Sequence, residues 1–177
     1  SSYVFRSAQE AAARFAGDEP GNIYSRFTNP TVGACEARLA ATEGGECCVA
    51  TASGMSAISC TLLQLCRSGD HIVSSDTIYG GTHALLSEML PQFGITTTFV
   101  DPTDIKAIEQ AITPQTRVLY TETMGNPTLK IADIRGISKL AGARGVSLVV
   151  DNTFTPMIIS PARLGAEVHF GPAAPDP

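Results

Sequence analysis

The sequence predicts an α/β fold with a mainly parallel sheet and helices on both of its faces. Two observations lead to this prediction. Segments with a strand pattern alternate with segments with a helical pattern five times along the chain. The strand segments are also continuous apolar runs, which is typical of strands buried on both faces. Such strands require helices on both sides of the sheet.

The expected elements follow one another in a regular order. The first long helix is expected over 31–42, where Ala and Leu share one face and two glycines follow. Further helices are expected from Gly54 to about Cys66 and over 80–90, 103–112 and 133–143. Strands are expected over 47–51, 71–74, 95–100, 117–122 and 146–151.

The composition argues against several classes of function. The net charge is −5 and the basic residues are scattered, whereas a nucleic-acid surface requires clustered Lys and Arg. No apolar run reaches the roughly 18 residues of a membrane span, and the N-terminus lacks the pattern of a signal peptide. We therefore expect a soluble, cytoplasmic protein that binds neither nucleic acid nor a membrane.

Cysteine and histidine usage is consistent with this expectation. The five cysteines are odd in number, show no CxxC spacing and have apolar neighbours, which predicts reduced and mostly buried thiols. His71, His83 and His169 are too dispersed to predict a metal site.

The loops after the strands carry candidate binding residues, because ligands of parallel sheets bind beyond the carboxyl ends of the strands. Ser53, Gly54 and Met55 open a helix, whose free N–H groups and positive dipole end suit a phosphate. An ordinary serine N-cap is the alternative. In the next loop, two glycines beside Tyr79 leave space for a flat ligand against the ring. A turn with a packed tyrosine is the alternative there.

Two further loops place polar groups at strand ends. Asn126 precedes Pro127, which favours an extended backbone that can present the amide to the strand ends. For this motif alone, a simple loop is the favoured interpretation. Asp151 follows a buried strand, where a carboxylate needs a partner such as a protonated pyridine nitrogen. The alternative is an Asp that caps the next turn.

Five sequence blocks occur in a fixed order: YSRFTNPT, ASGMSAI, IYGGT, GNPT and VVDNTF. Through these blocks the chain resembles the cystathionine γ-synthase-like family, also called the Cys/Met-metabolism family, whose enzymes depend on pyridoxal 5′-phosphate. The resemblance runs from about residue 1 to about residue 168. Within the family, YGGTHALL and FGITTTFVD are most similar to the plant-type methionine γ-lyases.

The resemblance implies a fold and an assembly. The fold is that of the large domain of the aspartate aminotransferases, and the assembly is a homotetramer built from tight dimers. Residues 1–30 would then be part of an N-terminal arm, and residues 31–168 would be an incomplete domain that binds pyridoxal phosphate. Residues 169–177 would be a divergent tail, and the small C-terminal domain would be absent.

The resemblance also assigns catalytic roles to Tyr79 and Asp151. Tyr79 would stack on the pyridine ring and assist proton transfer. Asp151 would pair with the ring nitrogen, and Thr153 belongs to the same binding set. Asn126 would bind the cofactor near its 3-hydroxyl group, and Glu122 would support that region.

The remaining implied roles concern the phosphate of the cofactor. Gly54 and Met55 would donate their backbone N–H groups to it, and Ser53 would add a hydroxyl. Tyr24 and Arg26 would reach the phosphate in a neighbouring subunit. Arginine suits bidentate phosphate recognition, although a surface arginine in a turn is the alternative for this segment alone.

The chain departs from the family pattern after Ala166, where the family continues with a strand and then the Schiff-base lysine. The only lysines are Lys106, Lys130 and Lys139, and none matches that position. We therefore expect a sequence truncated before the catalytic lysine, and a chain that is inactive by itself.

The resemblance leaves the reaction of the parent enzyme open. The leading interpretation is a methionine γ-lyase, which converts L-methionine to methanethiol, 2-oxobutanoate and ammonia. The alternatives are cystathionine γ-synthase or an O-acyl-homoserine sulfhydrylase, since bacterial methionine γ-lyases have Cys where this chain has Gly81. A third interpretation is a non-catalytic truncated isoform. In both enzymatic cases the substrate is a small amino acid.

Overall fold

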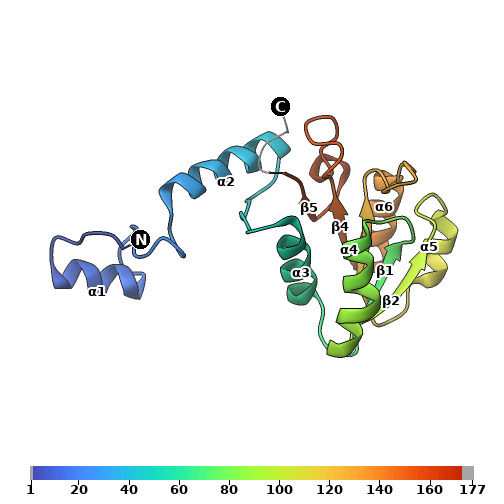
Figure 1. Ribbon diagram of the computed structural model, residues 1–177, viewed down its shortest axis with the longest axis horizontal. Coiled ribbons are helices and arrows are strands. Elements are labelled where there is room, and N and C mark those ends of the chain that lie inside the picture. Colours follow the sequence, from blue (N-terminus) through green and yellow to red (C-terminus); the bar gives the residue numbers. More distant parts are fainter. Residues whose placement is uncertain (1, 173–177) are drawn as a thin grey trace. The chain divides into compact units, whose positions relative to one another are not determined.

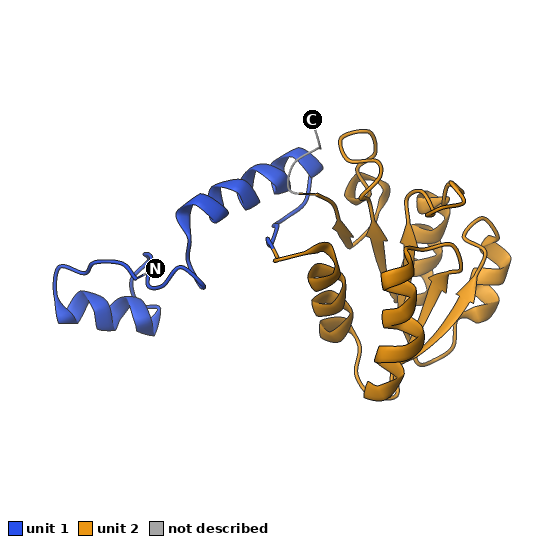
Figure 2. Ribbon diagram, viewed as in Figure 1, with its two compact units in different colours: residues 1–50 blue, residues 51–177 orange. Residues whose placement is uncertain are grey.

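The computed structural model describes residues 2–172, so residues 173–177 of the expected tail lie outside the described part. The chain divides into two compact units, residues 1–50 and residues 51–177 (Figure 2). The division falls after Ala50, whereas the sequence predicts that the large domain begins at residue 31.

The first unit contains two helices, each of which begins at a side-chain cap. The helix α1 (Ala8–Ala16) starts after Ser7, whose side chain accepts a backbone N–H of the first turn. The helix α2 (Pro30–Glu43) starts after Asn29, which caps it in the same way. Neither helix contains a buried side chain. The helix α2 confirms the one expected over 31–42, whereas α1 is not among the predicted elements.

The strand expected over 47–51 does not form. The N–H of Ala50 donates to a side-chain oxygen of Glu36, at 2.8 Å, instead of to a neighbouring strand. The prediction is wrong because a short apolar run becomes a strand only where a second strand pairs with it.

The second unit is built on a five-stranded parallel sheet (Figure 1). The strand order is β2-β1-β3-β4-β5, so β2 and β5 form the edges. The strands are β1 (His71–Ser75), β2 (Thr96–Val100), β3 (Thr116–Glu122), β4 (Ser147–Asp151) and β5 (Val168–Phe170). The first four confirm the predicted strands. The three residues of β5 are too few for a readable hydrophobic period, and this strand crosses into the region expected as the tail.

Helices connect the strands and cover both faces of the sheet (Figure 1), which confirms the predicted fold class. They are α3 (Gly54–Leu65), α4 (Gly80–Ala84), α5 (Ile105–Ala111), α6 (Ile134–Arg144) and a 3-10 helix (Ala162–Leu164). The helix expected over 80–90 is α-helical only in α4. It continues as a π-helix (Leu85–Met89) and a 3-10 helix (Leu90–Phe93), which contains a proline at its start.

Alternate residues of each strand pack into two separate cores, because successive side chains of a strand point to opposite faces. One core joins α3 and the helices that follow Tyr79 to Ile72, Val118, Tyr120 and Val149. The other core joins α5 and α6 to Val73, Leu119, Leu148 and Val150. The strands β1, β3 and β4 are therefore covered on both faces, as the continuous apolar runs predict.

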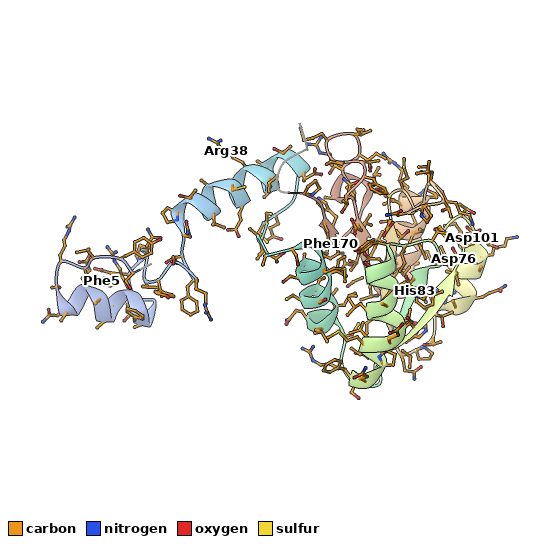
Figure 3. All side chains as sticks on the ribbon, viewed as in Figure 1. Phe5, Arg38, Asp76, His83, Asp101 and Phe170 are labelled. Atoms are coloured by element: carbon orange, nitrogen blue, oxygen red, sulfur yellow. The ribbon has the colours of Figure 1, made fainter. Side chains whose placement is uncertain are left out.

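The edge strand β2 is only partly covered. Thr96 and Thr98 are exposed, and the remaining side chains of the strand are half-buried. The ring of Phe99 stacks on the ring of His83 in α4, with centroids 4.7 Å apart; Figure 3 labels His83 on this helix. An edge strand has a neighbour on one side only, so the expectation of full burial fails here.

The five cysteines are free thiols, but only Cys66 is buried. The expectation of mostly buried thiols is wrong, since Cys35, Cys47 and Cys60 are exposed and Cys48 is half-buried. Apolar neighbours in the sequence do not ensure burial, because α2, which carries Cys35, has no buried side chain at all.

A buried histidine ties three strands together at the amino end of the sheet. His71 is the first residue of β1, and its Nδ1 lies 2.8 Å from the hydroxyl of Thr116 in β3. Its Nε2 lies 2.9 Å from the hydroxyl of Thr98 in β2. Burial lowers the pKa of His71 below its ordinary value of 6.5, because a charged imidazolium is poorly solvated there.

We predict that His71 makes the stability of the fold sensitive to acid. As the pH falls below about 6.5, the unfolded chain binds a proton that the folded chain resists, so the free energy of unfolding decreases. The raised pKa of Glu122 acts in the opposite direction, because the folded chain then binds a proton more readily than the unfolded chain does. Thermal unfolding of the unvaried chain and of His71→Gln, measured from pH 7.5 to 5, separates the two effects. The decrease should be smaller in His71→Gln, and parallel profiles would contradict the prediction.

Candidate functional site

A cavity of about 430 Å³ lies in the second unit, at the carboxyl ends of β3 and β4 and beside the start of α3. This volume is within the range of small-molecule sites. The residues that line it are Ser53, Gly54, Met55, Ile58, Tyr79, Glu122, Met124, Asn126, Asp151, Thr153 and Phe154. The sequence predicts eight of these as site residues, and the fold brings all eight together.

The start of α3 offers backbone donors to the cavity. The Oγ of Ser53 accepts the N–H of Ser56 at 3.1 Å, so Ser53 is the N-cap of the helix. The N–H groups of Gly54 and Met55 have no acceptor among residues 2–172. An N-cap and an anion site are therefore compatible here, because the cap uses one N–H group and leaves two for a ligand.

Glu122 joins two loops at the wall of the cavity. Its Oε1 accepts the N–H of Tyr79 at 2.7 Å, and its Oε2 accepts the N–H of Asn126 at 3.2 Å. Glu122 is buried, while the ring of Tyr79 is half-exposed. The carboxylate therefore fixes the backbone of both loops and leaves the tyrosine ring free to turn toward the cavity.

The environment of Glu122 raises its pKa above the ordinary value. Burial is the main cause, and the negative charge of Asp151, its partner in the register of β3 and β4, adds to it. The two bonds from backbone N–H groups act in the opposite direction, because they stabilise the ionised form.

Asp151 ends β4 and is held from one side. Its Oδ1 accepts both the N–H of Thr153, at 2.9 Å, and the hydroxyl of Thr153, at 2.5 Å. Within the described chain, Oδ2 has no hydrogen-bond donor. Asp151 thus caps the following turn, as the alternative interpretation expected, and still keeps one oxygen for a ligand in the cavity.

The loop after β4 is stiffened by a network of hydroxyl and amide groups. The hydroxyl of Thr155 lies 2.8 Å from that of Thr123 and 2.6 Å from Oδ1 of Asn152. The side-chain amide of Asn152 donates to the carbonyl oxygen of Ile159 at 2.8 Å. The network ties the loop that follows Asp151 to the end of β3 and therefore holds the backbone next to its carboxylate.

Two predicted residues, Tyr24 and Arg26, belong to the first unit. The carbonyl oxygen of Tyr24 accepts the N–H groups of Phe27 and Thr28 at 2.9 Å each, which forms a local turn. Arg26 is exposed and makes no ion pair in the part of the chain that the structure describes. Their expected role in a neighbouring subunit stays a prediction.

The sequence interpretation assigned no role to three apolar residues that line the cavity. Ile58 lies one helical turn after Gly54 and therefore on the same face of α3. This spacing is the sequence signal that could have predicted Ile58 as a lining residue. Met124 and Phe154 lie within two of the predicted loops. The two glycines after Tyr79, by contrast, do not line the cavity.

The cavity is lined by no lysine, among the residues that the structure describes. Lys130 lies 2.6 Å from Asp101, with which it forms an ion pair, and Lys106 and Lys139 belong to α5 and α6. Those two helices pack on the face of the sheet opposite α3. No group of three or more acidic, histidine or cysteine side chains in the described chain is placed to hold a metal ion.

No helix over residues 2–172 is long and apolar enough to cross a membrane.

The geometry and the sequence agree with one known family. A sequence model described as Cys/Met metabolism PLP-dependent enzyme matches residues 1–173. The chain belongs to this family. Pyridoxal phosphate is the family's cofactor, and the cavity fits it: free N–H groups for a phosphate, an exposed ring face for stacking and a carboxylate oxygen for a ring nitrogen.

Relatives of known activity include lyases and sulfhydrylases. The chain is 48% identical to O-succinylhomoserine sulfhydrylase from Pseudomonas aeruginosa, over 95% of this chain and 42% of the relative. It is 55% identical to methionine gamma-lyase from Arabidopsis thaliana, over 82% of this chain and 34% of the relative. The chain thus spans less than half of the curated relatives it matches.

A solved structure supports the same assignment. The protein from Campylobacter jejuni described as an O-acetylhomoserine (thiol)-lyase superposes with a TM-score of 0.87 and 39% identity. The match covers 95% of this chain and 42% of that chain, which carries N′-pyridoxyl-lysine-5′-monophosphate.

We predict that Glu122 stabilises the site by holding its two loops. Glu122→Ala leaves two partly buried N–H groups without acceptors, which should lower the free energy of unfolding by roughly 1–3 kcal/mol. Urea denaturation followed by circular dichroism measures the change. Glu122→Gln keeps one acceptor oxygen and should lose less. An alanine variant as stable as the unvaried chain contradicts this role.

Proposed function

We propose that the protein carrying this chain is a methionine γ-lyase, which converts L-methionine to methanethiol, 2-oxobutanoate and ammonia. The observation that carries the proposal is the cavity itself, where free N–H groups, an aromatic ring and a carboxylate face one small volume. The 55% identity to the Arabidopsis thaliana methionine gamma-lyase supports this reaction within the family.

Each lining residue has a role that follows from its chemistry. The N–H groups of Gly54 and Met55, at the positive end of α3, bind the phosphate, and the ring of Tyr79 stacks on the cofactor. Oδ2 of Asp151 holds a proton on the ring nitrogen, while Thr153 orients the carboxylate. Asn126 binds near the 3-hydroxyl group. The bound cofactor supplies an electron-accepting ring, which is what weakens bonds at the α-carbon of an amino acid.

The protein also needs an amine that the lining residues do not supply. We therefore propose that residues 1–177 bind the cofactor without a covalent bond and are inactive alone. We further propose a cytoplasmic homo-oligomer, in which Tyr24 and Arg26 serve a neighbouring subunit. The exposed apolar side chains of the first unit support such an assembly, since an isolated surface rarely leaves so many uncovered; they include Val4, Phe15, Phe27, Val32 and Val49.

A sulfhydrylase is the second candidate. The sulfhydrylase from Pseudomonas aeruginosa is 48% identical over 169 residues, a longer match than that with the plant lyase. The two reactions share the cofactor, but a sulfhydrylase uses an O-acyl-homoserine and a sulfur nucleophile in place of L-methionine.

The reaction is tested with the full-length protein that contains this sequence. We expect methanethiol and 2-oxobutanoate from L-methionine, and a reduction of kcat by roughly 100-fold or more in Asp151→Asn, because the ring nitrogen then loses its proton. Faster sulfide-dependent replacement on an O-acyl-homoserine would favour the sulfhydrylase. Turnover of neither substrate would refute both enzymatic proposals.

We predict that Arg26 acts across a subunit boundary. Arg26→Ala should weaken cofactor retention by roughly 1.5–3 kcal/mol, through loss of a charge-assisted phosphate contact. Mixing Arg26→Ala subunits with Asp151→Asn subunits should restore activity, because one of the two sites in a hybrid dimer then carries neither change. If neither variant is active alone and the mixture stays inactive despite proven subunit exchange, Arg26 acts within its own subunit.

A further inference from the structure

The side chain of Arg14 joins three parts of the first unit. Its Nη2 donates to Oε1 of Glu10 at 2.6 Å, one turn earlier in α1. Its Cζ lies 5.8 Å from the centroid of the Phe5 ring, within the range of a cation–π contact; Figure 3 labels Phe5 beside α1. A Cβ atom on Gly21 would lie 2.7 Å from Cζ and from Nε of Arg14, so the guanidinium lies directly against the backbone of Gly21. Arg14 thereby ties the segments before and after α1 to the helix.

The guanidinium of Arg14 is held in this place by Glu10. The second carboxylate oxygen of Glu10 accepts the N–H of Arg6 at 2.5 Å, so the carboxylate cannot turn away from Arg14. The side chains of Arg14 and Glu10 are only 24% and 17% exposed, so water screens this pair less than a fully exposed one. The ion pair therefore anchors the flat contact between Arg14 and Gly21.

The loop that carries Tyr24 and Arg26 begins two residues after Gly21. Its own hydrogen bonds close it: the N–H of Ile23 donates to the hydroxyl of Thr28 at 2.9 Å, and the carbonyl oxygen of Tyr24 accepts the N–H of Thr28 at 2.9 Å. Because these internal bonds keep the shape of the loop, a contact that holds Gly21 also sets where the loop lies beside α1.

A second tie to the loop comes from the start of the chain. Ser2 and Tyr24 form an isolated antiparallel bridge. A single bridge close to a chain end opens readily, so it holds the loop only if the first residues are themselves tied down. Phe5 follows Ser2 closely and contacts the guanidinium of Arg14. Arg14 therefore holds both partners of the bridge to one helix.

We propose that Arg14 is a positioning residue, which holds the loop of Tyr24 and Arg26 in a fixed place beside α1. Neither α1 nor α2 contains a buried side chain, so these helices supply no apolar core that could hold the loop instead. In the proposed function, Tyr24 and Arg26 bind the phosphate in a neighbouring subunit. Arg14 then favours phosphate binding because a loop already in place loses less freedom, a consequence that rests on the proposed function.

The first experiment follows the loop itself and needs no cofactor. Amide hydrogen exchange over residues 21–28 of this chain is measured by mass spectrometry. Arg14→Ala should speed that exchange about tenfold or more, because the loop opens more often. Arg38→Ala is the matched control, since Arg38 is exposed on the other helix of the same unit, where Figure 3 labels it. Unchanged exchange in Arg14→Ala, or an equal increase in Arg38→Ala, overturns the proposal.

Two further measurements separate positioning from general stability. Exchange over residues 8–16 should rise at most about threefold in Arg14→Ala, because alanine is a good helix former and a pair within one helix contributes little. Equal acceleration in α1 and in the loop means that the variant unfolds the unit, which refutes the positioning role. Arg14→Lys keeps the charge beside Glu10 but not the flat contact with Gly21, so slow exchange should return only in part. Complete return refutes the role of that contact.

The second experiment measures affinity in the apo form of the full-length protein that contains this sequence. The ligands are 4′-deoxypyridoxine 5′-phosphate, which lacks the aldehyde and binds without a covalent bond, and the same compound without its phosphate. By titration calorimetry, Arg14→Ala should weaken binding of the phosphorylated compound about fivefold, a part of the loss expected for Arg26→Ala. Binding of the other compound should change less than about twofold. Equal weakening of both compounds refutes an effect through the phosphate loop.

The outcomes separate this proposal from the proposed function. In a protein with Tyr24→Phe and Arg26→Ala, adding Arg14→Ala should have no further effect on affinity, because the loop then no longer binds the phosphate. A further loss there refutes the positioning role. If Arg26→Ala by itself leaves the affinity for the phosphorylated compound unchanged, the proposed role of Arg26 is refuted. Hydrogen exchange over residues 21–28 still decides, in that case, whether Arg14 holds the loop.

Discussion

The buried carboxylate of Glu122 is the constraint on which the geometry of the cavity depends. It ends β3, and its two oxygens accept N–H groups from two different loops, those of Tyr79 and Asn126. A buried carboxylate without such donors would be costly, so both loops must keep their N–H groups directed at it. The loop that carries the ring of Tyr79 and the loop that carries Asn126 are thereby held at a fixed distance from each other.

A second carboxylate, on the neighbouring strand, has a different task. Asp151 is the register partner of Glu122, so the parallel sheet places the two acids side by side at its carboxyl edge. Glu122 uses both oxygens on backbone donors, whereas Asp151 uses only Oδ1, on Thr153. The other boundary of the cavity is the positive end of α3. A ligand that carries both an anionic and a cationic group suits such a cavity.

Much of this arrangement could be predicted from local sequence signals. The Ser53-Gly54 pair marks the start of α3 because caps act within one helical turn, and Asp151 stands out because it follows a buried apolar strand. Predictions failed where the outcome depends on distant partners. The apolar run over 47–51 is not a strand, because its Ala50 N–H bonds to Glu36 instead. Burial of a cysteine likewise depends on whether another element packs against it, and α2, which carries Cys35, has no buried side chain.

The sequence by itself determined the order of elements from α3 to β4, the family and the four loops that carry the site, since these follow from patterns of neighbouring residues. Only the tertiary structure decided which partners each polar group takes. The carboxylate of Glu122 binds the N–H of a residue 43 positions away, and that pairing exists because β3 lies beside β1 in the sheet. The tertiary structure also distinguishes Gly81 from Gly80. The two glycines are adjacent in the sequence and differ only in their surroundings, because the side chain of Tyr79 lies over Gly81 and not over Gly80. Glu122 of β3 holds the backbone of Tyr79 in this place.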